Sequence, residues 1–299
     1  MDRNSDFGAK LELFFGAASD ALAHVYARLH GVVPEAGLRL TGSLVGPKCR
    51  YAQTLPAQFS FVDRGAGPTL LAEALVPEPC FWTPEMPHLY QATLELRRGE
   101  QVIAKCTRDF GIRTLGIAGT SLNYDGKRWV LRGMRSDQLP SIELGELRAC
   151  DAALLVDHPV EPLCREASQL GVLLIAQLST PDAGELARLA RWPAVAIVVL
   201  PAGCMLDPAG LPPNMLLAAR VPWGTSDDIP TWAQIAMFDI DEKHPPQRIP
   251  GKKLPLIAIR KFDGMYRSAA EGRVLCDRLQ RELAGCDELA GLDFAGYIV

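Results

Sequence analysis

The sequence has no closely spaced cysteine pairs and few histidines. Eight cysteines and only five histidines are present, and no two cysteines form a Cys-x-x-Cys pair. Zinc ligands usually come in closely spaced pairs, so this pattern favours reduced, mostly buried thiols over a metal site or disulfides. We expect no metal ion and no other cofactor, and no cysteine has a spacing that marks it as catalytic.

The sequence also lacks an excess of charge of one sign. Its 31 basic and 35 acidic residues give a net charge of −4 and are mixed along the chain, which leaves no electrostatic footprint for nucleic acid or an anionic membrane. No apolar run is long enough to span a bilayer, and the N-terminal region carries the acidic residues Asp2 and Asp6. These absences predict a cytoplasmic protein with no nucleic-acid or membrane partner.

What the sequence does have is enough apolar content for two cores and one clear change of pattern. Its 299 residues are 48% hydrophobic, which suits one large or two ordinary domains. The pattern changes across residues 107–135, where a strand ending near Thr114 is followed by the turn Asn123-Tyr124-Asp125-Gly126-Lys127 and a strand over 128–134. We therefore predict one domain over 1–117 and a second over 118–299.

The first domain reads as an antiparallel sandwich. Short apolar runs are separated by Gly, Pro and other turn residues, as in all-β proteins. Residues 21–27 suit a helix by composition and a strand by alternation, and both remain open. The predicted segments are 11–15, 21–27, 37–41, 57–61, 70–75, 89–96 and 102–110.

The second domain reads as a barrel of parallel strands. Eight apolar runs have the composition of strands covered on both faces, and four helical segments lie between some of them. The strands are predicted over 130–133, 152–156, 172–176, 195–200, 215–219, 234–238, 256–259 and 294–299, and the helices over 142–147, 160–170, 183–190 and 265–284. Residues 129–299 are only roughly 170 in number, against about 250 for a usual (β/α)₈ barrel.

The shortage falls between Leu200 and Leu254, where nine prolines leave little room for helices. Helices that are missing from a barrel should leave apolar strand surface uncovered, and such surface usually meets a partner. We therefore expect a homo-oligomer or a protein partner that covers the shortened part of the barrel.

Four short motifs in sequence order carry a resemblance to a known family. They are Phe81-Trp82-Thr83-Pro84-Glu85-Met86-Pro87-His88-Leu89-Tyr90, Phe110-Gly111-Ile112-Arg113-Thr114, Asn123-Tyr124-Asp125-Gly126-Lys127 and Leu131-Arg132-Gly133-Met134-Arg135. In order and spacing they resemble family 2 glycoside hydrolases of the β-galactosidase and β-glucuronidase type. The resemblance implies an immunoglobulin-like β-sandwich followed by a shortened, degenerate (β/α)₈ TIM-type barrel, truncated and without the jelly-roll domain that precedes the sandwich in that family.

The resemblance also implies where the catalytic carboxylates should be. In that family the acid/base and the nucleophile follow the fourth and seventh barrel strands, and these positions fall on Gly203 and Arg260. A guanidinium cannot act as a carboxylate nucleophile. No Asp or Glu lies within three residues of Gly203, and the nearest to Arg260 is Asp263. We therefore predict no catalytic residues at these two positions.

Polar residues remain at other strand ends and form a candidate ligand-binding rim: Asp157, His158, Asp239, Asp241, Arg260 and Asp263. The preferred hypothesis is a pseudo-glycosidase, a catalytically inactive protein that acts as a carbohydrate-binding or protein-interaction module. The alternative is an active O-glycosyl hydrolase whose acid and base have moved to these carboxylates.

Overall fold

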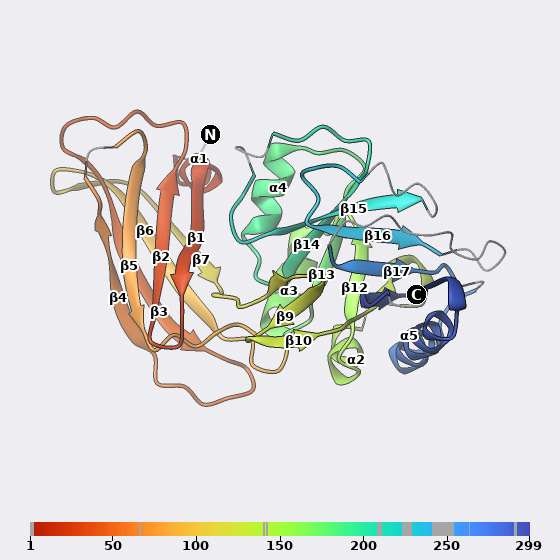
Figure 1. Ribbon diagram of the computed structural model, residues 1–299. Coiled ribbons are helices and arrows are strands. Elements are labelled where there is room, and N and C mark those ends of the chain that lie inside the picture. The colour runs from red at the N-terminus through yellow and green to blue at the C-terminus, as the bar shows by residue number, and fades with distance from the viewer. Residues whose placement is uncertain are drawn as a thin grey trace. The chain divides into compact units, whose positions relative to one another are not determined.

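The computed structural model describes residues 3–65, 67–139, 141, 143–207, 211–222, 229–240, 254–262, 264–289 and 292–299 (Figure 1). The chain divides into two compact units. The first contains Met1–Arg113 with Arg191–Pro193, and the second contains Thr114–Ala190 with Ala194–Val299.

The first unit is a curled, antiparallel, sandwich-like sheet, which confirms the predicted fold. Its seven strands are in the order β1-β2-β5-β4-β3-β6-β7. Strand β4 pairs with β3 through residues 57–61 and with β5 through residues 62–63, so it joins the two halves of the sheet. The strands are β1 (Leu11–Ala18), β2 (Leu22–Leu29), β3 (Leu38–Lys48), β4 (Ala57–Asp63), β5 (Leu70–Pro77), β6 (Leu89–Arg98) and β7 (Gln101–Phe110).

Residues 21–27, which were open between helix and strand, form most of β2. Ala23, Val25, Ala27 and Leu29 are fully buried, and the residues between them are partly exposed. This period of two is the pattern of a strand with one face on a core. The sequence did not predict helix α1 (Arg3–Lys10), which packs against β7.

Two aromatic residues of the first resemblance motif pack inside the protein. Trp82 and Tyr90 are 0% and 1% exposed, and Tyr90 belongs to the core of the first unit. The Tyr90 hydroxyl accepts a hydrogen bond from the Cys80 N–H at 2.9 Å. The large apolar area of these rings therefore stabilises the fold and is not presented to a ligand.

The second unit begins with a small sheet of β8 (Gly116–Ala118), β9 (Ser121–Tyr124) and β10 (Lys127–Trp129). Asp125 and Gly126 have φ angles of 50° and 70°, as a two-residue hairpin turn requires, so the predicted turn is confirmed. The single strand predicted over 128–134 is wrong. Its residues belong to two sheets, because Arg128 pairs with Asn123 in the hairpin whereas β11 (Leu131–Arg135) pairs in the barrel.

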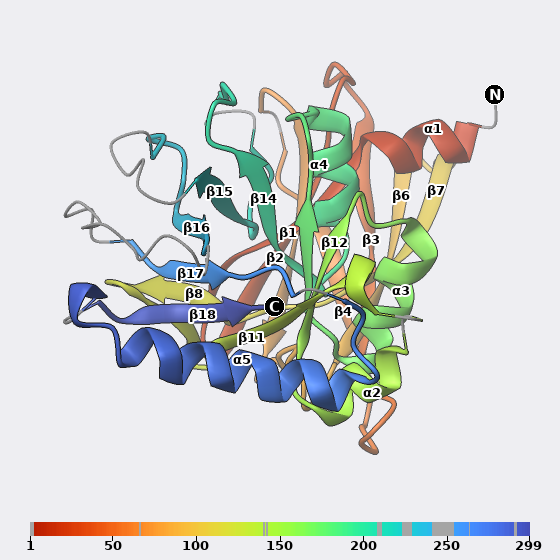
Figure 2. The same ribbon diagram turned by 90° about the vertical axis from the view of Figure 1, so that its right-hand side faces the viewer.

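The barrel is closed and has eight strands, as the eight apolar runs predicted. Neighbouring strands are parallel throughout, and β18 closes the barrel by pairing with β11 (Figure 2). The remaining strands are β12 (Ala153–Asp157), β13 (Leu174–Gln177), β14 (Val195–Pro201), β15 (Leu216–Pro222), β16 (Ile235–Asp239), β17 (Leu256–Ile259) and β18 (Phe294–Ile298).

All four predicted helices are present as α2 (Leu144–Ala149), α3 (Glu161–Leu170), α4 (Ala183–Ala190) and α5 (Ala269–Ala284). Helix α5 packs against β11 and β18 (Figure 2). It begins four residues later than predicted because the Ser268 hydroxyl accepts a hydrogen bond from the Glu271 N–H and caps the helix. Among the described residues, no helix is long and apolar enough to cross a membrane.

The described residues between β14 and β17 contain no α-helix. The strands there are nevertheless covered: consecutive residues of β15 and β16, including Ala218, Ala219, Ala236 and Met237, are fully buried. Successive side chains of a barrel strand point to opposite faces, so both faces of these strands are covered. The uncovered apolar surface that the sequence predicted is therefore not found on them, and a protein partner or homo-oligomer stays a prediction.

Candidate functional site

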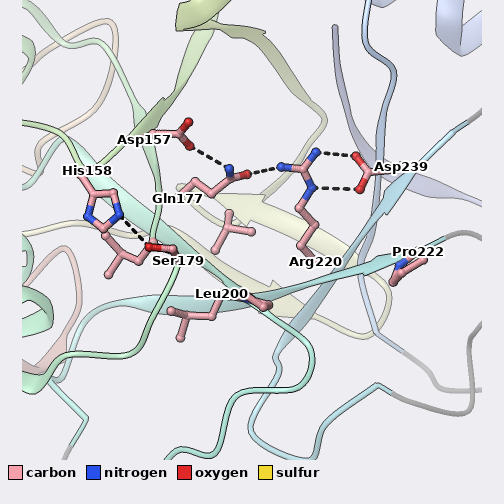
Figure 3. A pocket seen from close by; sticks show the side chains of 11 residues that line it. Asp157, His158, Gln177, Ser179, Leu200, Arg220, Pro222 and Asp239 are labelled. Atoms are coloured by element: carbon pink, nitrogen blue, oxygen red, sulfur yellow. Dashed lines mark hydrogen bonds and ion pairs between the residues drawn. The ribbon is translucent and has the colours of Figure 1, made fainter.

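A cavity of about 620 Å³ opens at the carboxyl ends of β12 to β16. In parallel barrels this end carries the functional residues, because the loops that follow the strands converge there. The cavity has an apolar floor and a polar wall (Figure 3). Its lining residues are Asp157, His158, Gln177, Leu178, Ser179, Val199, Leu200, Pro201, Arg220, Pro222 and Asp239.

Four polar side chains on the wall form one continuous chain of hydrogen bonds, which we call the mouth network: Asp157, Gln177, Arg220 and Asp239 (Figure 3). Arg220 holds Asp239 through two bonds, from Nε at 2.9 Å and from Nη2 at 2.7 Å. Its Nη1 donates to Gln177 Oε1 at 2.5 Å. Gln177 Nε2 then donates to Asp157 Oδ1 at 2.7 Å. The network thus links β12, β13, β15 and β16.

His158 lies next to the mouth network and has a strained backbone. Its φ is 44°, in the left-handed region, and its N–H donates to the carbonyl of Gln177 at 3.0 Å. Its ring Nε2 is 3.2 Å from the Ser179 hydroxyl. Within the described part of the chain no group bonds to Nδ1 of this ring. The His158–Ser179 pair therefore lacks the third group that orients the histidine base in a Ser-His-Asp hydrolase triad.

Arg135, at the end of β11, lies near the same network. It donates to Asp137 from Nε at 3.0 Å and from Nη2 at 2.8 Å. The bonds to Asp137 raise the pKa of Arg135, and the charges of Asp157 and Asp239 act in the same direction. The same hydrogen bonds lower the pKa of Asp137.

The Arg135–Asp137 pair predicts a loss of stability in acid. The pKa of Asp137 is lower in the folded state than in the unfolded chain, so its contribution is complete above the unfolded value and is lost as the pH falls through the folded value. We expect the thermal midpoint to fall as the pH is lowered from about pH 5 to about pH 2, and the fall to be smaller in Asp137→Asn. Differential scanning fluorimetry measures this. Asp151→Asn, at an exposed turn residue, is the control, and an equal fall in the two variants would contradict the prediction.

Three of the six predicted rim residues line this cavity: Asp157, His158 and Asp239. Arg260 follows β17, but its Nη1 donates to Glu282 on α5 and it is not part of the lining. Asp241 and Asp263 lie outside the described residues. Gly203, the other position compared with the family, follows the end of β14.

The sequence analysis missed Gln177, Ser179 and Arg220. Gln177 and Arg220 follow directly after predicted strands, so the strand-end rule that selected Asp157 would have found them as well. Among the described residues, no group of three or more His, Cys, Asp or Glu could hold a metal ion.

The sandwich unit and the closed barrel with a polar mouth together have the architecture of glycosyl hydrolases family 2. Residues 50–113 match the sequence pattern of that family, which confirms the resemblance that the motifs predicted. A comparison with curated protein sequences gave no match.

Solved structures of family 2 enzymes have the same fold. Bifidobacterium dentium β-glucuronidase, complexed with coumarin-3-O-glucuronide, superposes with a TM-score of 0.63 at 14% identity over 97% of this chain and 59% of that chain. A family 2 member from Bacteroides cellulosilyticus DSM 14838 superposes with a TM-score of 0.62 at 15% sequence identity, over 97% of this chain and 45% of that chain. Parabacteroides merdae β-glucuronidase superposes with a TM-score of 0.60 at 13% sequence identity, over 97% of this chain and 46% of that chain. The chain therefore spans roughly half the length of these enzymes.

Proposed function

We propose that this family 2 glycosidase-like chain binds carbohydrate in the barrel-mouth cavity without hydrolysing it. The observation that carries the proposal is the mouth network, in which Gln177 and Arg220 stand between the two carboxylates of the cavity wall, Asp157 and Asp239.

A retaining glycosidase needs two carboxyl groups about 5 to 5.5 Å apart with the scissile bond between them. Here an amide and a guanidinium link the two carboxylates through an unbroken series of hydrogen bonds. Both oxygens of Asp239 are bonded to Arg220. A sugar could reach the space between the carboxylates only by breaking this network, which argues against their use as an acid and nucleophile pair.

The two positions that carry the carboxylates in the resembling family support the same proposal. One is Gly203, and the other is Arg260, whose guanidinium is paired with Glu282 on α5. Neither residue can give or take a proton as a carboxyl group does. The reaction of the family would have to use other groups.

The lining is well suited to a sugar. Carbohydrates present hydroxyl groups on an apolar ring, and they bind where donors and acceptors converge beside apolar side chains. Asp157, Gln177 and Ser179 offer acceptors and donors on one wall. Leu178, Val199, Leu200, Pro201 and Pro222 provide the apolar surface of the cavity.

A glycan array run beside a panel of aryl β-glycosides tests the proposal. We expect binding of at least one glycan and no release of aryl alcohol above the blank. Asp157→Asn and Asp239→Asn should alter binding, whereas Asp293→Asn, whose residue bonds to Arg128 just before β18, should not. Turnover that disappears in Asp157→Asn or Asp239→Asn would overturn the proposal.

That outcome would establish the second candidate, an active glycosidase with relocated carboxylates. The observation in its favour is that Asp157, His158 and Asp239 line one cavity, as a rebuilt acid and base pair requires. The matched variants Asp157→Asn and Asp239→Asn distinguish the two candidates, since only an active enzyme has turnover to lose.

A further inference from the structure

We propose that the barrel-mouth cavity selects sugars that carry a positive charge, such as amino sugars, over neutral sugars and uronic acids. This inference rests on the proposed carbohydrate-binding function. It comes from a difference between the charged groups at the mouth of the barrel. The described arginines there are paired with carboxylates, whereas one carboxylate accepts a hydrogen bond on only one of its two oxygens.

Each described arginine in or after the last residues of a strand at the mouth has an acidic partner. Arg220 is bound to Asp239 through two bonds, Arg135 to Asp137 through two bonds, and Arg260 to Glu282. A sugar carboxylate would have to compete with these partners for a guanidinium. Such competition costs the energy of an existing charge-assisted pair.

Asp157 is the exception among the charged residues of the lining. Its Oδ1 accepts one hydrogen bond, from the neutral Gln177 amide, and within the described ranges no group bonds to Oδ2. The residue is exposed at the cavity. An ionised carboxylate only accepts hydrogen bonds, so its open oxygen is matched by an ammonium group, which only donates them.

The charge of the lining favours the same ligand. Asp157 and Asp239 face one guanidinium, Arg220, while His158 bonds through its ring to the neutral Ser179. Arg135 lies close enough for both carboxylates to raise its pKa, but its own charge is balanced by Asp137. Lys261 is exposed and is not part of the lining, and its charge lowers the pKa of Asp137. The cavity wall therefore has an excess of one negative charge at Asp157.

Titration of the full chain with three matched glycosides at neutral pH tests the inference. The probes are methyl β-D-glucosaminide, methyl β-D-glucoside and methyl β-D-glucuronide, followed by ligand-observed NMR or calorimetry. We expect the glucosaminide to bind about fivefold more tightly than the glucoside, as one partly exposed charge pair allows, and the glucuronide to bind most weakly. The advantage of the amine should shrink as salt is added.

The variant Asp157→Asn keeps an oxygen for the Gln177 amide and removes only the charge. It should abolish the preference for the amine, so that the glucosaminide and the glucoside bind the variant with equal affinity, while Asp293→Asn should leave the preference as it is in the unchanged protein. Equal affinities for the three probes, or tightest binding of the glucuronide, would overturn this inference and leave the proposed function standing. If none of these probes binds and the glycan array is also empty, the proposed function fails and this inference fails with it.

Discussion

Tyr90→Ala should destabilise the sandwich unit by about 3–5 kcal/mol, the usual range for removing a large buried aromatic side chain. Tyr90 is 1% exposed, lies in the core of the unit and has a hydroxyl bonded to the Cys80 N–H. The substitution leaves a cavity and removes the acceptor of the partly buried Cys80 N–H. Urea denaturation followed by circular dichroism measures the loss, and a change below about 1 kcal/mol would show that the ring is not part of a packed core.

Tyr90→Phe separates the two contributions, because it keeps the ring and removes only the acceptor for Cys80. We expect it to lower the free energy of unfolding by about 1–2 kcal/mol. Tyr51→Ala is the matched control, because Tyr51 belongs to the same unit and is 42% exposed. It should change the free energy of unfolding little. Burial also raises the pKa of Tyr90 to about 12, so a spectrophotometric titration of Tyr90→Phe should show one late-titrating tyrosine fewer.

Gln138→Leu should destabilise the barrel unit by about 3 kcal/mol, since the buried Tyr266 hydroxyl and two partly buried carbonyl bonds lose their partner at once. Gln138 is 3% exposed and ends the 3₁₀ helix η1 (Ser136–Gln138) that follows β11. Its Nε2 donates to the carbonyls of Phe262 and Gly264, and its Oε1 accepts from the Tyr266 hydroxyl at 2.9 Å. A leucine fills the space but bonds to none of these groups.

A double-mutant cycle with Tyr266→Phe tests whether these groups act as one network. Because both single variants break the same bond, the loss in the double variant should be smaller than the sum of the two single losses. Gln169→Leu, at an exposed position on α3, is the control for the side-chain change and should be nearly neutral. Additive losses would mean that the Gln138–Tyr266 bond contributes nothing to stability.

The fold could be predicted well because its signals are local. Barrel strands that are covered on both faces are continuous apolar runs, and all eight were visible in the sequence. Helix α4 was predicted with its observed ends, 183–190. The errors occur where a boundary depends on the partner strand: residues 128–134 look like one strand, and only their pairing assigns them to two sheets.

The site was less predictable because its partners come together only across strands. The strand-end rule selected Asp157, His158 and Asp239, and all three line the cavity. The same rule placed Arg260 at the rim, yet its side chain bonds to Glu282 on α5. Alternate residues of a barrel strand face the interior or the covering helices, and a one-residue difference in register decides which.

The sequence by itself determined the sandwich, the eight-stranded barrel and the set of polar residues at the strand ends. Apolar periodicity and residue identity depend on neighbours in the chain, so they can be read without coordinates. Only the tertiary structure decided that Gln177 and Arg220 link Asp157 to Asp239, leaving Asp157 with an open oxygen. Hydrogen bonds between side chains on different strands depend on strand register and side-chain direction, which the barrel fixes as a whole.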